Sequence, residues 1–174
     1  MRHFFKLRRH AAKAALLSAA ALLLGLSGAQ VASAGNTTSS FQVKIRIGLD
    51  CTVSATNLDF NTVGVLAAAV DAASSVTVTC GNGTPYQVGL DKGGGIGATT
   101  ANRLMTGPGG ATVRYSMYHN AARDNGWGDT LGSDTYSDTG TGSALTLPVY
   151  GRVFQQTTPA PGAYADNITV TVTY

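Results

Sequence analysis

The chain has 174 residues and a formal net charge of +3 at pH 7, with 12% charged and 44% hydrophobic residues. Five of its twelve basic residues lie within residues 1–13, which leaves seven against nine acidic residues and a net charge of −2 for the rest. That balance excludes nucleic-acid binding through a generally basic surface. Glutamate is absent, and glycine, threonine and serine are abundant, which is typical of an all-β protein.

Residues 1–34 have the three parts of a secretory signal peptide. A basic start, MRHFFKLRRHAAK, precedes a thirteen-residue apolar run at 14–26, and a small-residue exit, ASA, follows at 32–34. An uncleaved membrane anchor is the alternative, although the apolar run is short for crossing a bilayer. We therefore take residues 35–174 as the mature, secreted chain, which has the length of one domain.

The mature chain opens with a regular alternation of apolar and polar residues. Since successive side chains of a strand point to opposite faces, this pattern predicts a strand with one apolar face. The strand could be the first strand of the domain itself, or residues 35–49 could be an extension that is donated to another molecule, with a mixed case also open. The apolar positions are Phe41, Val43, Ile45, Ile47 and Leu49.

The only two cysteines of the chain are Cys51 and Cys80. In an exported protein such a pair is expected to form a disulfide. Free thiols or a metal-binding pair are the alternatives, but a thiolate metal site needs further ligands, and His119 is the only histidine after residue 34.

Short apolar–polar alternations bounded by turn residues continue to the end of the chain and predict seven or eight strands in total. Residues 67–74 are expected to form a loop, and residues 119–143 a long polar loop. Pro148 predicts a sheet edge or a bulge. The pattern favours a two-sheet sandwich of immunoglobulin-like type. The expected strands after the first are 58–66 (with a turn near Asn61), 75–80, 86–91, 103–105, 111–118, 144–154 and 164–174.

The sequence contains few residues that could form an enzyme active site. A Ser–His–Asp arrangement would depend on His119, no G-x-S-x-G motif accompanies it, and we interpret it as a surface histidine at a strand end. Trp127 could stack on a sugar, although packing over a sheet is the favoured interpretation. An irregular calcium site in the aspartate-rich loop is possible, but the EF-hand spacing fails and the aspartates are expected to form turns. We predict no catalytic residue, no metal and no cofactor. The loop aspartates are Asp124, Asp129, Asp134 and Asp138.

Several segments, in order, resemble the spore coat protein U domain family, which includes subunits of archaic chaperone–usher pili. The likeness covers nearly all of the mature chain, and the ordered set is more specific than any one piece. The glycine run after Lys92 and the long loop before Trp127 depart from it. The matching segments are LDCTVSATNLDF, VTVTC, YQVGLDKG, NRLM, VRYSMY, WGD, LPVYGRV and PGAYADNITVTVTY.

The resemblance implies an incomplete immunoglobulin-like β-sandwich over residues 50–174 that lacks its last strand. A periplasmic chaperone would lend that strand, and the N-terminal extension of a neighbouring subunit would replace it as a fibre grows through an outer-membrane usher. Cys51–Cys80 would be the disulfide of the family. The strand implied to contact the chaperone carries Ile168, Val170, Val172 and Tyr174.

The expected function is therefore a structural subunit of a surface pilus, secreted through the periplasm and used for adhesion or biofilm formation. A carbohydrate-binding module that uses Trp127 is one alternative, and a secreted coat protein that never forms fibres is another. An enzyme is the least favoured.

Overall fold

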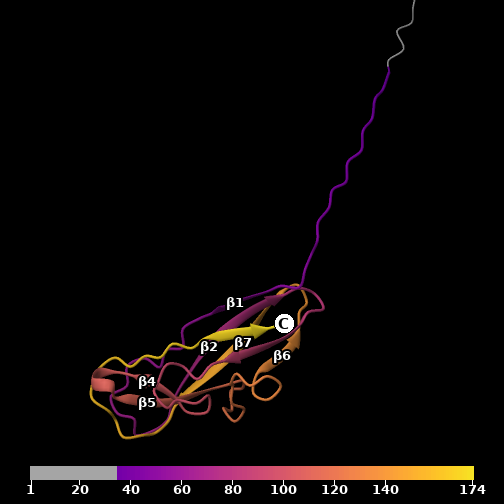
Figure 1. Ribbon diagram of the computed structural model, residues 1–174. Coiled ribbons are helices and arrows are strands. Elements are labelled where there is room, and N and C mark those ends of the chain that lie inside the picture. The colour runs from indigo at the N-terminus through magenta and orange to yellow at the C-terminus, as the bar shows by residue number, and fades with distance from the viewer. Residues whose placement is uncertain (1–34) are drawn as a thin grey trace, which may run out of the picture. The chain divides into compact units, whose positions relative to one another are not determined.

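A computed structural model describes residues 35–174 of the chain and contains eight strands and one short 3-10 turn (Figure 1). The predicted all-β class is confirmed. Within the described residues no helix is long and apolar enough to cross a membrane. The elements are β1 (Cys51–Ala55), β2 (Val70–Cys80), β3 (Pro85–Leu90), β4 (Arg103–Thr106), η1 (Pro108–Gly110), β5 (Thr112–Tyr118), β6 (Tyr136–Thr139), β7 (Ala144–Val153) and β8 (Val170–Thr173).

The strands form two antiparallel sheets. One has the order β1-β2-β7-β5-β4, and the other has the order β6-β3-β8. In Figure 1, β8 is the yellow strand that ends at the label C, and it runs beside β1, with which it is in contact. The strands β1 and β8 are thus edge strands of different sheets. This arrangement confirms the predicted immunoglobulin-like sandwich.

The core lies between the two sheets and is built from alternate residues of the strands. Val76 and Val78 of β2 face Val88 and Leu90 of β3, and each of the four is at most 2% exposed. Side chains that alternate between the two faces of a strand produce this pattern when one face is covered and the other meets solvent.

The chain between β1 and β2 differs from its prediction in two ways. Residues 58–66 form no strand, although Asn61 does turn the chain, with a φ of 58° and its N–H bonded to the Asp59 carboxylate. The predicted loop at 67–74 is wrong from Val70 onward, because β2 begins there and pairs with β7. Asp71 strengthens this pairing by accepting two hydrogen bonds, at 2.7 and 2.8 Å, from the Arg152 guanidinium.

Two further expectations need adjustment. The polar stretch 119–143 is not a loop throughout, since it contains β6, which pairs with β3. Pro148 lies within β7, a central strand, but in the part that pairs with β2 alone, because the ladder with β5 covers only Tyr150–Val153. Pro148 therefore does occupy a local edge, where a missing N–H is tolerated.

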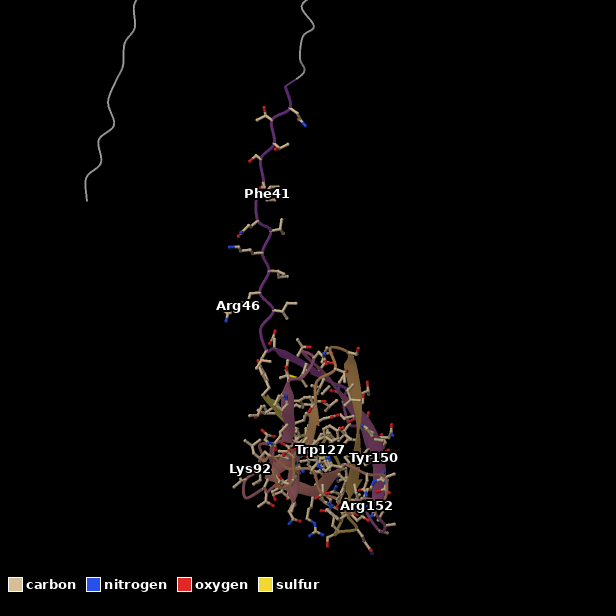
Figure 2. The ribbon with its side chains drawn as sticks, turned by 90° about the vertical axis from the view of Figure 1, so that its right-hand side faces the viewer. Phe41, Arg46, Lys92, Trp127, Tyr150 and Arg152 are labelled. Atoms are coloured by element: carbon tan, nitrogen blue, oxygen red, sulfur yellow. A yellow bond between two sulfur atoms is a disulfide. The ribbon has the colours of Figure 1, made fainter. Side chains whose placement is uncertain are left out.

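The chain divides into two units at Val43, and the second unit, from Lys44 to Tyr174, contains all eight strands. Residues 35–50 form neither helix nor strand, and β1 begins only at Cys51. The five apolar side chains of residues 41–49 are between 69% and 88% exposed. Phe41 and Arg46 mark this stretch in Figure 2. The predicted strand at 41–49 is therefore not formed by this chain alone. The predicted signal peptide, residues 1–34, lies outside the described residues.

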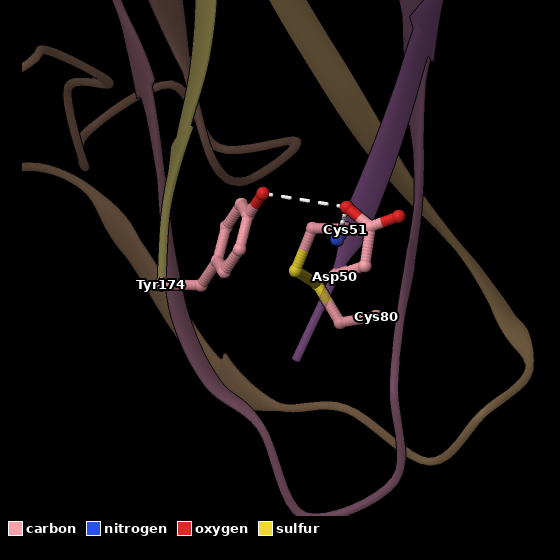
Figure 3. Close-up of a disulfide and its surroundings, with 4 residues drawn as sticks. All are labelled: Asp50, Cys51, Cys80 and Tyr174. Atoms are coloured by element: carbon pink, nitrogen blue, oxygen red, sulfur yellow. Dashed lines mark hydrogen bonds between the residues drawn. A yellow bond between two sulfur atoms is a disulfide. The ribbon is translucent and has the colours of Figure 1, made fainter. Parts of the chain in front are cut away.

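A disulfide joins Cys51, the first residue of β1, to Cys80, the last residue of β2 (Figure 3). The two residues are direct partners in the β1–β2 ladder, so the covalent link confirms the expected pairing and fixes its register. The link closes a loop with a sequence separation of 29 residues.

We expect reduction of this disulfide to lower the free energy of unfolding by about 3–4 kcal/mol, because a loop of this length loses entropy in the unfolded chain when it is closed. Urea unfolding of the mature chain with and without a thiol reductant measures the difference. The Cys51→Ala, Cys80→Ala double variant should match the reduced protein and should not respond to reductant. Equal unfolding midpoints for oxidised and reduced protein would contradict the expectation.

Candidate functional site

A groove of about 520 Å³ enters the sandwich between its two sheets. One wall is the stretch that follows β1, including Leu58 and Phe60, and the other is the stretch that leads into β8, including Ile168 and Val170. Core side chains such as Val76 and Met117 form the floor. The groove therefore leads down to the hydrophobic core, although its floor stays buried, with Val76 at 2% and Met117 at 4% exposure.

The inward face of β1 shows that this side of the sandwich lacks a cover. Val53 is paired with Val78 in the β1–β2 ladder, so both point to the same face of the sheet. Val78 is 1% exposed, whereas Val53 is 42% exposed. Ala55, paired with the buried Val76, is exposed as well. One further strand opposite β1 would be needed to bury this row.

The strand β8, on the other sheet, likewise has an open edge and an apolar row that is only partly covered. It forms a ladder with β3 only, so its second edge carries no strand partner within residues 35–174. Val170 and Val172 are half-buried although their partners Leu90 and Val88 are buried. Unpaired backbone groups beside an open apolar row are the features that accept an added strand.

The predicted chaperone-contact residues lie at this edge, but not all of them line the groove. Ile168 and Val170 do line it, whereas Val172 and Tyr174 are not part of its lining. The hydroxyl of Tyr174 instead donates a hydrogen bond to the Asp50 carboxylate at 3.3 Å, beside the disulfide (Figure 3). The end of β8 is thereby linked to the residue immediately before β1.

A glycine of β7 makes the wall after β1 possible. Gly151 faces the interior, and a Cβ atom there would lie 2.5 Å from Leu58 Cδ2 and 2.8 Å from Phe60 Cζ. The two side chains therefore pack directly over the strand, and the Phe60 ring contacts Tyr115 edge-on with centroids 6.3 Å apart. This packing explains why the apolar alternation at 58–60 forms a wall of the groove and not a strand.

The Gly151→Val variant should displace Leu58 and Phe60. We expect a loss of about 1–3 kcal/mol in unfolding free energy, because the added side chain overpacks this contact. Urea denaturation of the mature chain measures it. Gly64→Val is the matched control. Gly64 lies in the connection between β1 and β2, as Leu58 and Phe60 do, but a Cβ added there has no atom within 4 Å, so stability should change by less than about 0.5 kcal/mol. Equal effects of the two variants would contradict the proposed packing.

Asp166 fixes the opposite wall. Its carboxylate accepts hydrogen bonds from the Tyr115 hydroxyl at 2.8 Å and from the Gly94 N–H at 2.8 Å. Burial and this hydrogen bond raise the pKa of Tyr115 well above its usual value. Asp91 accepts a further bond from the Thr169 N–H at 3.0 Å. The segment that leads into β8 is therefore held against the glycine-rich loop and the groove floor.

Arg103 is a structural residue beside the groove walls whose burial the sequence did not indicate. Its side chain is fully buried, and it donates hydrogen bonds to four main-chain carbonyls, those of Leu90, Asp91, Thr100 and Trp127. Burial lowers the pKa of the guanidinium. The side chain connects β4, on one sheet, to the end of β3, on the other.

The structure places Trp127 in the core and not on a sugar-accessible surface (Figure 2). It is 1% exposed, and its indole N–H donates to the Val88 carbonyl at 2.9 Å. His119 stacks on it with ring centroids 4.4 Å apart and is half-buried, so the interpretation of His119 as a surface residue is wrong. Burial lowers the pKa of His119.

The aspartates of the long polar loop do not gather into a set of metal ligands in the described part of the chain. Among residues 35–174, no three His, Cys, Asp or Glu side chains come together in a way that could hold an ion. Asp134 instead accepts a hydrogen bond from the Thr130 N–H at 2.7 Å, and Asp124 accepts one from the Asn120 side chain. These two aspartates thus form turns, as the sequence analysis expected.

The fold and the groove define a class of protein: an incomplete immunoglobulin-like sandwich in which the edges of β1 and β8 are open and a groove leads between the sheets to the core. The chain belongs to the Spore Coat Protein U domain family, whose sequence profile matches residues 37–171. The resemblance noted in the sequence is thereby confirmed. No curated protein matches the chain significantly.

The chain is also similar to solved structures, of which the first has the same fold. One is a chain of the CsuC–CsuE chaperone–tip adhesion subunit pre-assembly complex from the archaic chaperone–usher Csu pili of Acinetobacter baumannii, with 22% identity and a TM-score of 0.55. The match covers 74% of this chain and 40% of that chain, so the protein spans less than half the length of that relative. HdaB, the minor tip subunit of the E. coli Hda pilus, has 18% identity and a TM-score of 0.36, with 71% of this chain and 79% of that chain covered.

Proposed function

We propose that this protein is a secreted structural subunit of a chaperone–usher pilus and that it polymerises by donor-strand exchange. The observation that carries the proposal is the groove, where β1 and β8 leave the place of one strand open. In this proposal the donor is the extension 35–49 of a neighbouring copy, whose apolar row would fill the groove of the next subunit. Membership of the family and the fold shared with a pilus subunit complex support it.

The energetics of this exchange are favourable. Five large apolar side chains, each worth about 1.5–3 kcal/mol when buried, give a gross gain of about 7–15 kcal/mol, which is an upper bound. Main-chain hydrogen bonds along the free edge of β8 would add to this, while ordering the extension would cost part of it. Burial of the apolar row would thus be the main favourable contribution to holding the subunits together without covalent links. The five donor residues are Phe41, Val43, Ile45, Ile47 and Leu49.

Before assembly, the open groove and its free strand edges need a temporary cover. We propose that a periplasmic chaperone lends a strand along β8, at Ile168, Val170, Val172 and Tyr174, and that an outer-membrane usher exports the growing fibre. The fibre would lie at the cell surface and serve adhesion or biofilm formation. A subunit released without a chaperone would have an uncovered groove and would tend to aggregate, because open sheet edges pair with other chains.

The other candidate functions have less support. A carbohydrate site on Trp127 would need an accessible indole ring, and this ring is buried. A non-fibrous coat protein would not require an extension with a single apolar face. The family and the fold are those of structural proteins, and the described residues provide no arrangement that suggests an enzyme.

Deletion of residues 35–49 tests the proposal. We expect the truncated subunit to bind the chaperone as the complete mature chain does, but to form no polymers. Electron microscopy and size-exclusion chromatography of the two proteins after release from the chaperone measure the difference. Polymers formed by the truncated subunit would refute the donor role. Loss of chaperone binding on truncation would refute the division of roles between the extension and β8.

A further inference from the structure

The groove and the extension carry opposite charges. Only two charged residues line the groove, Asp59 on the wall after β1 and Asp166 on the wall before β8, and both are acidic. The extension 35–49 also has two charged residues, Lys44 and Arg46, and both are basic.

Neither groove aspartate forms an ion pair within residues 35–174, although the buried Arg103 guanidinium interacts electrostatically with Asp166. The ion pairs among residues 35–174 join Asp71 to Arg123 and Arg152, and none involves Asp59 or Asp166. Asp59 is exposed, and its carboxylate accepts one hydrogen bond, from the N–H of Asn61. Asp166 is half-buried and held in place by hydrogen bonds from Tyr115, Gly94 and Asn167. The groove therefore has one fixed negative charge on each wall.

The alternation of the extension places its charges where they can meet these aspartates. If the odd-numbered apolar row enters the groove, Lys44 and Arg46 belong to the opposite row, which faces the mouth. Their long side chains can bend toward either wall while the aliphatic stems cover apolar surface. A strand with aspartate or glutamate at the same positions would meet like charges, which disfavours the wrong partner.

We propose that Lys44 and Arg46 of one copy are specificity-determining residues that pair electrostatically with Asp59 and Asp166 of the copy whose groove receives the strand. This inference rests on the proposed function and adds to it a rule for choosing the donor: the groove prefers a strand that is apolar on one face and basic on the other. The pairs act mainly on the rate of strand uptake and on its salt dependence, since charges at the rim of an interface steer the encounter.

The assembly rate of the complete mature chain after release from the chaperone tests the inference. The Lys44→Glu, Arg46→Glu variant should assemble about ten-fold or more slowly than wild type at about 20 mM salt, and the difference should shrink at about 500 mM salt because ions screen exposed charges. The control is Lys92→Glu, Arg114→Glu, which makes the same change in net charge at exposed positions outside the groove lining and the extension.

A third variant adds Asp59→Lys to the reversed extension and should recover most of the lost rate at low salt. Asp59 is chosen because Asp166 also holds the wall of the groove. Equal rates for the reversed extension and its control at low salt would overturn the inference while leaving the proposed function intact, provided that polymers form. Failure of Asp59→Lys to restore any of the rate would also overturn it. Absence of polymers from the wild-type chain would overturn both.

Discussion

Replacing Ile45 and Ile47 with aspartate should abolish polymer formation by the mature chain while leaving the stability of its folded unit unchanged. Both side chains are 86–88% exposed in the single chain, so the change removes no packing from the subunit itself. In an inserted strand, each would lose about 1.5–3 kcal/mol of burial and would bring a carboxylate against the apolar floor. The loss of burial alone weakens strand uptake by roughly a hundred-fold to ten-thousand-fold.

The polar row of the same strand provides the control. Ser40→Asp, Gln42→Asp adds the same two charges, but on the face that would point away from the groove, and should slow assembly by only a few-fold. Polymer yield by electron microscopy and subunit stability by urea unfolding give the two readouts. Polymers from the Ile45, Ile47 variant at the wild-type rate would rule out this strand as the donor.

Replacing Arg103 with methionine should destabilise the folded unit by about 3–5 kcal/mol, because four main-chain carbonyls, two in buried and two in part-buried hydrogen bonds, would lose this donor. Methionine is chosen because it is long and apolar and so fills most of the space of the arginine side chain. The effect therefore reports the hydrogen bonds more than a cavity. Urea unfolding of the mature chain measures it.

Arg114→Met is the matched control for Arg103→Met. Arg114 is exposed and lies over the Phe154 ring at 4.7 Å from its centroid, a contact worth about 0.5–1 kcal/mol at an exposed site. Its removal should therefore cost about 1 kcal/mol or less. Similar losses for the two variants would contradict the proposed contribution of the Arg103 hydrogen bonds to stability.

The strands of the sandwich could be predicted where the alternation of side chains reflects burial on one face. Val76, Val78 and Val88 are examples, because the local pattern alone indicates which face is covered. The prediction failed at residues 58–60 for a long-range reason. Leu58 and Phe60 alternate as in a strand, but Gly151, more than ninety positions later, offers them a surface on which to pack. No local pattern contains that information.

The site was predicted only in part for the same reason. The apolar row of the extension is visible in sequence, since it needs no partner to be recognised. The groove depends on contacts between distant residues, such as Asp166 with Tyr115 and Gly94. A lone arginine such as Arg103 carries no sequence signal that it is buried.

The disulfide beside the Tyr174–Asp50 contact has a consequence for how copies could be arranged. Because both lie next to residue 50, the point where the extension leaves the sandwich is anchored to the ends of β1, β2 and β8. Under the proposed function, every junction would join the extension of one copy to the groove of the next. Such head-to-tail contacts between unlike surfaces do not have to close into a ring. The fibre would be polar, with an empty groove on the subunit at one end. A copy without the extension 35–49 could accept a strand but donate none, so it would terminate the fibre.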